Sequence, residues 1–117
     1  MATRTGSGKW TARSVHKWSV SGLLNGDVSN TLNAPNLPDK TVSVSGVFGV
    51  GGSLSLEGDN VDGTGGVILK DTSGANLTFT AAGVAAIAPD AEFIRAHVTA
   101  GDGTTNLRVD IISTKAK

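Results

Sequence analysis

The chain contains no cysteine and no tyrosine, and only two tryptophans and three phenylalanines among its 117 residues. The absence of cysteine excludes disulfide bridges, thiolate metal sites and a cysteine nucleophile. With so few aromatic residues, a core must be built mainly from Val, Leu and Ile. No apolar run approaches the roughly 20 residues that a membrane-spanning helix requires. We therefore expect no membrane segment, and the start of the chain lacks the apolar stretch of a signal peptide.

Glycine is abundant, with 16 residues, and short stretches of alternating polar and apolar residues recur along the chain. The clearest of these stretches span residues 41–48, 53–58, 92–100 and 106–113. Turn-forming clusters separate them, and no stretch of useful length has helical spacing. This pattern is typical of an all-β fold, and the chain length suits one domain. The sequence therefore predicts a single-domain, jelly-roll-like β-sandwich.

The formal net charge is zero, but the charges are unevenly distributed. Residues 1–20 hold four of the ten basic residues and no acidic residue, and two more lysines lie at the end of the sequence. This split predicts a flexible basic N-terminal arm (residues 1–9), a sandwich domain (residues 10–114) and a basic C-terminal tail (residues 115–117). We expect the arm to become ordered only against an acidic partner surface.

Basic residues and both tryptophans cluster near the start of the chain. In a chain this poor in aromatics, a tryptophan usually anchors a core or a subunit interface, while stacking of nucleic-acid bases is the alternative. We favour an interface with another protein or with a second copy of the chain. The predicted interface residues are Arg4, Lys9, Trp10, Arg13, Lys17 and Trp18.

The Gly-Asp-Gly sequence at residues 101–103 has three interpretations: a cation-binding loop, a catalytic carboxylate or a turn. A calcium loop of the EF-hand type needs several oxygen ligands and a terminal Glu. After Asp102, however, the next carboxylate is Asp110. Because alternating stretches flank the motif on both sides, we predict a hairpin turn.

A second acidic stretch, with Glu57, Asp59 and Asp62, has two interpretations: a weak calcium site or a solvated turn, which we favour. His16 and His97 are the only histidines, and neither has a third metal ligand or an oriented nucleophile beside it in the sequence. The sequence therefore predicts no catalytic, cofactor-binding or metal-binding residue, and no enzyme.

The glycine-rich segments also fail as nucleotide-binding loops. Residues 5–11 read TGSGKWT, and Trp10 stands directly after the Gly-Lys pair, where a phosphate-binding loop requires Ser or Thr. Residues 48–54 read FGVGGSL, and a strand rather than a helix is expected to follow, unlike in a dinucleotide fingerprint. Neither segment is therefore expected to bind a nucleotide.

Short motifs in the second half of the chain point to a known family. Residues 55–58 read SLEG, residues 77–83 read LTFTAAG, residues 93–95 read FIR and residues 101–105 read GDGTT. With these motifs the second half resembles small structural proteins of tailed bacteriophages. The resemblance implies a capsid decoration, or cement, protein that binds the shell of the major capsid protein and stabilises the head.

The same resemblance implies a location on the outer capsid surface of the virion, after synthesis in the cytoplasm of the bacterial host. A homodimer or homotrimer is expected from the symmetry of such shells, with no direct contact to nucleic acid or membrane. Two alternative functions would also place the protein in a phage particle. The protein could be a receptor- or carbohydrate-binding module of a tail fibre or spike, or a minor head–tail component. A hydrolase or other enzyme is a further alternative.

Overall fold

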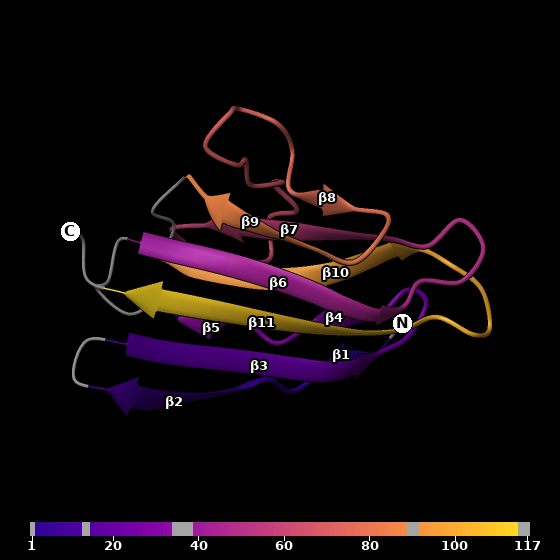
Figure 1. Cartoon of the computed structure of the whole chain (residues 1–117), viewed down its shortest axis with the longest axis horizontal. Helices are drawn as coiled ribbons and strands as arrows, with labels where there is room; N and C mark the ends of the chain where they lie inside the picture. The colour runs from indigo at the N-terminus through magenta and orange to yellow at the C-terminus, as the bar shows by residue number, and fades with distance from the viewer. Residues whose placement is uncertain (1, 13–14, 34–38, 89–91, 115–117) are drawn as a thin grey trace.

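The computed structural model describes residues 2–12, 15–33, 39–88 and 92–114, and this part of the chain consists of two β-sheets (Figure 1). Sheet A has the strand order β1 (Thr3–Arg4), β4 (Val28–Ser29), β10 (Phe93–Ala100), β7 (Ser53–Asp59) and β8 (Thr78–Phe79), and β5 (Leu32–Asn33) also pairs with β10. Sheet B has the order β2 (Ser7–Ala12), β3 (Val15–Leu23), β11 (Asn106–Thr114), β6 (Asp39–Val47) and β9 (Gly83–Ile87). The described residues contain no helix, and hence none that is long and apolar enough to cross a membrane. The predicted all-β sandwich is confirmed.

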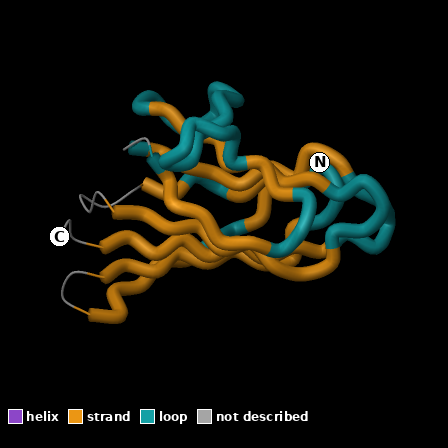
Figure 2. The backbone as a smooth tube through the Cα atoms, turned by 45° about the horizontal axis from the view of Figure 1, so that its top comes forward, coloured by secondary structure: helices purple, strands orange, loops and turns teal. Residues whose placement is uncertain are grey.

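The chain passes repeatedly from one sheet to the other. The connection after β6 leads from sheet B to sheet A, and the connection after β10 leads back to sheet B. Figure 2 shows loops gathered at one end of the strands, the end at which these two connections lie. The long strands β6 and β7, and likewise β10 and β11, therefore lie in different layers although they follow each other along the chain, as in jelly-roll folds.

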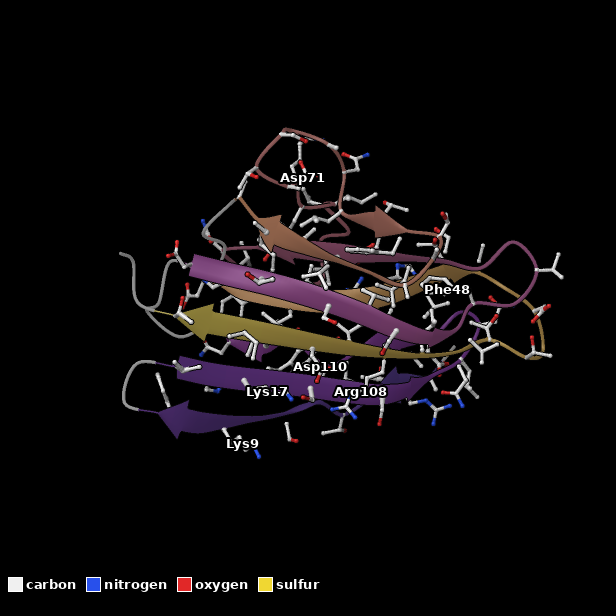
Figure 3. The ribbon with its side chains drawn as sticks, viewed as in Figure 1. Lys9, Lys17, Phe48, Asp71, Arg108 and Asp110 are labelled. Atoms are coloured by element: carbon white, nitrogen blue, oxygen red, sulfur yellow. The ribbon has the colours of Figure 1, made fainter. Side chains whose placement is uncertain are left out.

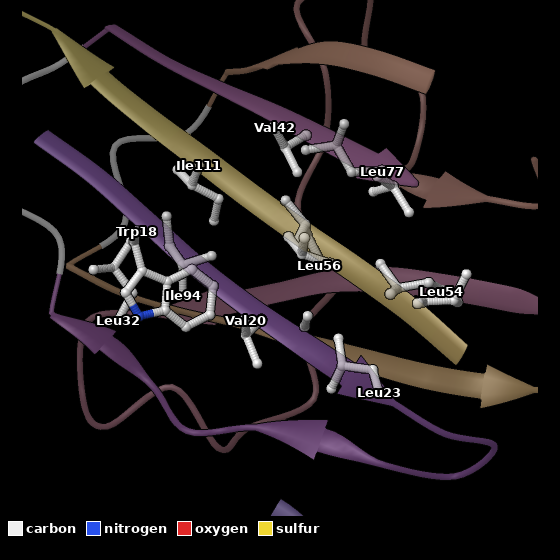
Figure 4. Packing of buried hydrophobic residues seen from close by; sticks show 14 of the residues in the cluster. Trp18, Val20, Leu23, Leu32, Val42, Leu54, Leu56, Leu77, Ile94 and Ile111 are labelled. Carbon is white, nitrogen blue, oxygen red and sulfur yellow. The ribbon is translucent and has the colours of Figure 1, made fainter. Parts of the chain in front are cut away.

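The core fills the space between the sheets and follows from the alternation of the strands. In β10, Ile94, Ala96 and Val98 are fully buried, while the residues between them are only partly buried. In β11, Val109 and Ile111 are fully buried in the same way. Because successive side chains of a strand point to opposite faces, one face of each strand supplies the core and the other faces outward. Figure 4 shows apolar side chains of both sheets, Ile94 and Ile111 among them, packed between the two layers.

The N-terminal segment belongs to both sheets. β1 pairs in parallel with β4, and β2 pairs antiparallel with β3. The segment predicted as a flexible arm, residues 1–9, is therefore paired with the domain over residues 3–4 and 7–9, while residues 13–14 and the predicted C-terminal tail, residues 115–117, lie outside the described residues. The physical reason is close packing: a Cβ atom at Gly6 would lie 2.5 Å from the Trp18 ring, so the glycine leaves room for the indole beside β2.

The Gly-Asp-Gly turn does not form the predicted hairpin. It joins β10 of sheet A to β11 of sheet B, and these strands do not pair with each other. Asp102 accepts hydrogen bonds from the backbone N–H of Thr104 (2.8 Å) and of Val50 (2.8 Å). The turn is therefore a bridge between layers, and its carboxylate holds two neighbouring loops together.

Candidate functional site

The outer face of sheet B carries a basic hollow over β2, β3 and β11. The hollow has a volume of about 250 Å³ and is lined by Ser7, Gly8, Lys9, Lys17, Ser19 and Arg108. Figure 3 shows Lys9, Lys17 and Arg108 over these three strands, together with Asp110. The residues point outward because their neighbours in sequence, such as Trp18 and Val109, point into the core. We call this set the basic hollow.

Lys9 and Lys17 face each other directly across β2 and β3. Like charges in directly opposed positions destabilise an antiparallel pair of strands. Ser7 and Ser19 form the next opposed pair, so their hydroxyl groups lie beside the two ammonium groups. The arrangement therefore concentrates positive charge and hydrogen-bond donors on one short stretch of sheet.

Arg108 is held in place by Asp110, two residues further along β11. The guanidinium donates from Nε to Oδ2 (2.9 Å) and from Nη2 to Oδ1 (3.1 Å). Ser19 also donates its hydroxyl to the Asp110 carboxylate (2.5 Å), and the Lys17 ammonium lies 4.0 Å from it. Burial alone would raise the pKa of Asp110, but the hydrogen bonds from Arg108 and Ser19 and the charges of Arg108 and Lys17 bring it below its usual value. An ionised Asp110 therefore orients the cations around it.

The charges of this cluster do not cancel. The hollow is lined by three cationic side chains, those of Lys9, Lys17 and Arg108, and a single carboxylate pairs with two of them, whereas the whole chain has as many acidic as basic residues. Among the described residues, Asp110 is the carboxylate that pairs with Lys17 and Arg108. An anionic ligand would balance the remaining charge.

The residues predicted to form an interface fall into several environments. Lys9 and Lys17 meet in the basic hollow, whereas Arg4 forms an ion pair with Asp27 (Nε to Oδ2, 2.7 Å). Trp18 is only 3% exposed and packs in the core, so its indole is unavailable to a partner. Trp10 is an exposed residue of β2, and Arg13 lies outside the described residues.

Two members of the cluster, Arg108 and Asp110, were absent from the predicted site. Their signal in the sequence is a charged pair two residues apart on the polar face of an otherwise apolar strand. That spacing places both side chains on one side of the sheet. Their meeting with Lys9 and Lys17 depends on β11 pairing with β3 in one register, and local alternation does not fix that register.

A second charged cluster lies on the outer face of sheet A. Glu57 is 5% exposed and accepts hydrogen bonds from Arg95 (Nε to Oε1, 3.0 Å) and shares one with His97 (Nδ1 to Oε2, 3.0 Å). Glu57 would have to give up these partners to bind the calcium ion of the alternative interpretation. The carboxylates of Asp59 and Asp62 accept hydrogen bonds within their own turn, which lowers the pKa of both.

The inner faces of the sheets offer no metal site in the described part of the chain. Jelly-roll barrels can enclose a ligand between their layers. Here the middle of that space is filled by buried Leu, Val and Ile side chains, and no three His, Asp or Glu residues among those described lie close enough to hold a metal ion. His16 lies in sheet B and His97 in sheet A, so the two histidines belong to different layers.

No family model and no curated protein matches the sequence. Among solved structures, the chain is similar to a cupin domain from Bordetella pertussis Tohama I, with a TM-score of 0.55 and 14% identity over 98% of this chain and 96% of that one. A second similar structure is KdgF from Halomonas sp., with a TM-score of 0.47 and 12% identity over 96% of this chain and 79% of that one.

The first comparison corrects the predicted function. The similar fold is that of a bacterial cupin domain, not of a phage structural protein, so the predicted role as a capsid decoration protein is wrong, together with its tail-fibre and head–tail alternatives. The phage-like motifs lie in turns and strand ends, which recur in unrelated β-sandwiches. The predicted homo-oligomer and the predicted location stay predictions. The comparison shows that the chain has a cupin-like, jelly-roll fold.

Proposed function

We propose that the chain is a binding module that holds an anionic group of its ligand, a phosphate, a sulfate or a carboxylate, in the basic hollow of sheet B. The observation that carries this proposal is the direct opposition of Lys9 and Lys17 across β2 and β3. That opposition costs stability in the free protein and is relieved when an anion lies between the two ammonium groups.

The donors of the hollow suit an oxyanion. Arg108 presents a planar fork of N–H groups, and Asp110 fixes its orientation before a ligand arrives. The lysines supply mobile point charges, and the Ser7 hydroxyl adds a neutral donor at the rim. A preorganised guanidinium lowers the entropy that binding would otherwise cost.

The chemistry of the hollow favours binding over catalysis. Ser19 donates a hydrogen bond to Asp110, so Asp110 is the group in the hollow that would have to act as a general base on this hydroxyl. The pKa of Asp110 lies below its usual value, so this carboxylate is a weak general base near neutral pH. The proposal is therefore of a binding protein.

The test is a titration of the full chain with inorganic phosphate and with a sulfated oligosaccharide, followed by backbone amide shifts in two-dimensional NMR. We expect saturable shifts at residues 7–9, 17–19 and 108–110, and weaker binding at higher salt. Lys17→Gln should weaken binding roughly tenfold, the loss expected for one charge-assisted hydrogen bond.

The matched control is Lys70→Gln. Lys70 is an exposed lysine outside the hollow, where its ammonium contacts the Asn76 side chain, so this variant removes the same charge elsewhere. It should bind the probes like the unmodified chain. If both variants lost the same affinity for the probes, the effect of Lys17→Gln would come from net charge alone, and the site would be refuted. Saturable shifts confined to residues outside the hollow would also refute the site.

A further inference from the structure

The charges of the basic hollow narrow the class of anion that it can bind. Lys9, Lys17 and Arg108 line the hollow, and Asp110 pairs with Lys17 and Arg108. Lys9 pairs with no carboxylate in the part of the chain that the structure describes. Three positive charges and one negative charge leave two positive charges in this cluster. A ligand group with two negative charges would therefore balance the hollow.

The single carboxylate of the cluster lies deeper than the cations. The side chain of Asp110 is 17% exposed, against 36% for Lys17 and 51% for Arg108. Its Oδ1 atom accepts hydrogen bonds from Ser19 and Arg108, and its Oδ2 atom accepts one from Arg108. Because both oxygens are engaged from within the cluster, the side of the hollow that faces solvent is positive. An approaching anion therefore meets the cations before it meets Asp110.

The cations of the hollow come from three neighbouring strands. Figure 3 shows Lys9 on β2, Lys17 on β3 and Arg108 on β11. A carboxylate presents two oxygens in one plane, whereas a phosphate monoester presents three terminal oxygens around its phosphorus, so that each cation can contact a different oxygen. Near neutral pH such a phosphate carries a charge of about −1.5 to −2. Its shape and its charge both match the hollow.

The hollow and its surroundings have room for the organic part of an ester. The volume of about 250 Å³ lies just below the roughly 300–1,000 Å³ of typical small-molecule sites. Across the neighbouring strand β6, Ser43 opposes Asp110 and Ser45 opposes Arg108. Residues that oppose each other on paired strands lie on the same face, so these two small, uncharged side chains adjoin the hollow. A neutral group joined to the phosphate can lie over them.

We propose that the ligand of the basic hollow is a phosphate monoester, with its dianionic phosphate between Lys9, Lys17 and Arg108 and its organic part over β6. This inference rests on the proposed anion site and names the class of its ligand. A sulfate ester has the same three terminal oxygens but a single negative charge. A carboxylate has a single charge and only two oxygens. Both leave one positive charge of the hollow unbalanced and should bind more weakly.

The decisive comparison is between methyl phosphate and methyl sulfate, because each probe has three terminal oxygens and only the charge differs. The full chain is titrated at about pH 8 and constant ionic strength, and the backbone amide shifts of residues 7–9, 17–19 and 108–110 are followed. We expect methyl phosphate to bind roughly tenfold more tightly, the difference expected for one additional charge-assisted contact.

The preference should depend on the charge of the probe. At about pH 5 most of the methyl phosphate carries one negative charge, because its second pKa is about 6, and the preference should then largely disappear. None of the described residues that line the hollow is a histidine, so the titrating group in this pH range is the probe. A preference that is unchanged at about pH 5 would contradict the charge argument and overturn the proposal.

Two variants and a larger probe locate the ligand. Lys9→Gln removes one of the two unbalanced charges and should reduce the preference for methyl phosphate. Lys70→Gln, which removes the same charge outside the hollow, should keep it. Glycerol phosphate should cause additional shifts at residues 43–45 of β6 that methyl phosphate does not cause. An unchanged preference in Lys9→Gln, or no additional shifts at residues 43–45, would overturn the proposed placement.

The outcome also separates this inference from the proposed function. If methyl phosphate and methyl sulfate bound with equal affinity and shifted the residues of the hollow, the monoester inference would be wrong while the anion site remained. If neither probe caused saturable shifts at these residues, both the anion site and the monoester inference would be refuted.

Discussion

Single aspartates fasten the turns of this protein. Asp62, Asp71 and Asp102 are each followed two residues later by Thr or Ser. In each case the carboxylate accepts both the backbone N–H and the hydroxyl of that residue; for Asp102 the two distances are 2.8 and 2.6 Å. Such local bonds give the turn backbone partners that a strand ladder cannot supply. Most acidic groups in the turns are thus structural.

The bonds at Asp102 predict a loss of stability in acid. The hydrogen bonds from the Thr104 hydroxyl and the Val50 N–H lower the pKa of Asp102 to about 2, from 3.8. Because the folded-state pKa is depressed, this stabilisation is present above about pH 4 and is lost as the pH falls towards about 2. The urea concentration at the unfolding midpoint should therefore fall as the pH is lowered from about 4 to about 2.

We call the change of the urea midpoint with pH in this range the pH slope. The Asp102→Asn variant should have a smaller pH slope, because it lacks one of the titrating carboxylates. Thr104→Val removes the hydroxyl donor but keeps the carboxylate and its backbone bonds, so it should reduce the slope only in part. A slope that is the same in all three proteins would show that other carboxylates dominate the acid transition.

At the residue scale, the sequence predicted the turn but not its bond to a distant loop. An Asp followed by Gly between two alternating stretches is a local pattern, and this pattern was sufficient to predict that the chain turns at Asp102. The bond to Val50 joins loops 52 positions apart and depends on the packing of two sheets. The basic hollow was likewise predictable only in part. Lys9 and Lys17 were predicted as interface residues, but their position side by side on one face depends on the register between β2 and β3.

The strands themselves were largely predictable from period-two alternation. Residues 41–48, 53–58, 92–100 and 106–113 correspond closely to β6, β7, β10 and β11. What alternation cannot show is which strands pair. β10 and β11 are neighbours in sequence with only a short turn between them, yet they lie in different sheets. The predicted hairpin was wrong for this reason.

The start of strand β2 was missed because Gly6, directly before the strand, and Gly8, within it, suggested flexibility. Their role is instead to let ring side chains of β3 lie beside the edge strand: a Cβ atom at Gly6 would approach the Trp18 ring to 2.5 Å. Gly6→Ala should therefore displace the buried indole and lower stability by about 1–3 kcal/mol, the cost of overpacking a core.

Gly103→Ala is the matched control for this variant. A Cβ atom at Gly103 would meet no atom within 4 Å, so the same chemical change creates no clash there. Chemical denaturation of both variants measures the difference. If Gly6→Ala proved as stable as Gly103→Ala, the fit of Trp18 against β2 would be looser than the structure indicates.

At the scale of the whole molecule, the first residues are part of the domain. Deleting residues 2–9 removes β1 and the first half of β2, and it leaves the Trp18 side of sheet B without its edge strand. We expect a loss of a few kcal/mol, as for the exposure of large apolar side chains, and a Tm lower by at least about 5 °C.

Calorimetry of the shortened chain tests this expectation. The control is the full-length variant Lys9→Gln, which removes a positive charge from the same segment but keeps the backbone pairing and the ion pair between Arg4 and Asp27. The control should lose much less stability than the deletion. An unchanged Tm in the shortened chain would mean that its first strands are only loosely attached.

The position of β11 has a consequence for how the protein is made. This strand comes last in the described chain, yet it lies at the centre of sheet B, between β3 and β6. A ribosome that has released residues 1–105 has produced both flanking strands but not the one that joins them. Sheet B can therefore close only after residue 114 has emerged, and until then the apolar faces of β3 and β6 stay uncovered and depend on chaperones or rapid synthesis for protection.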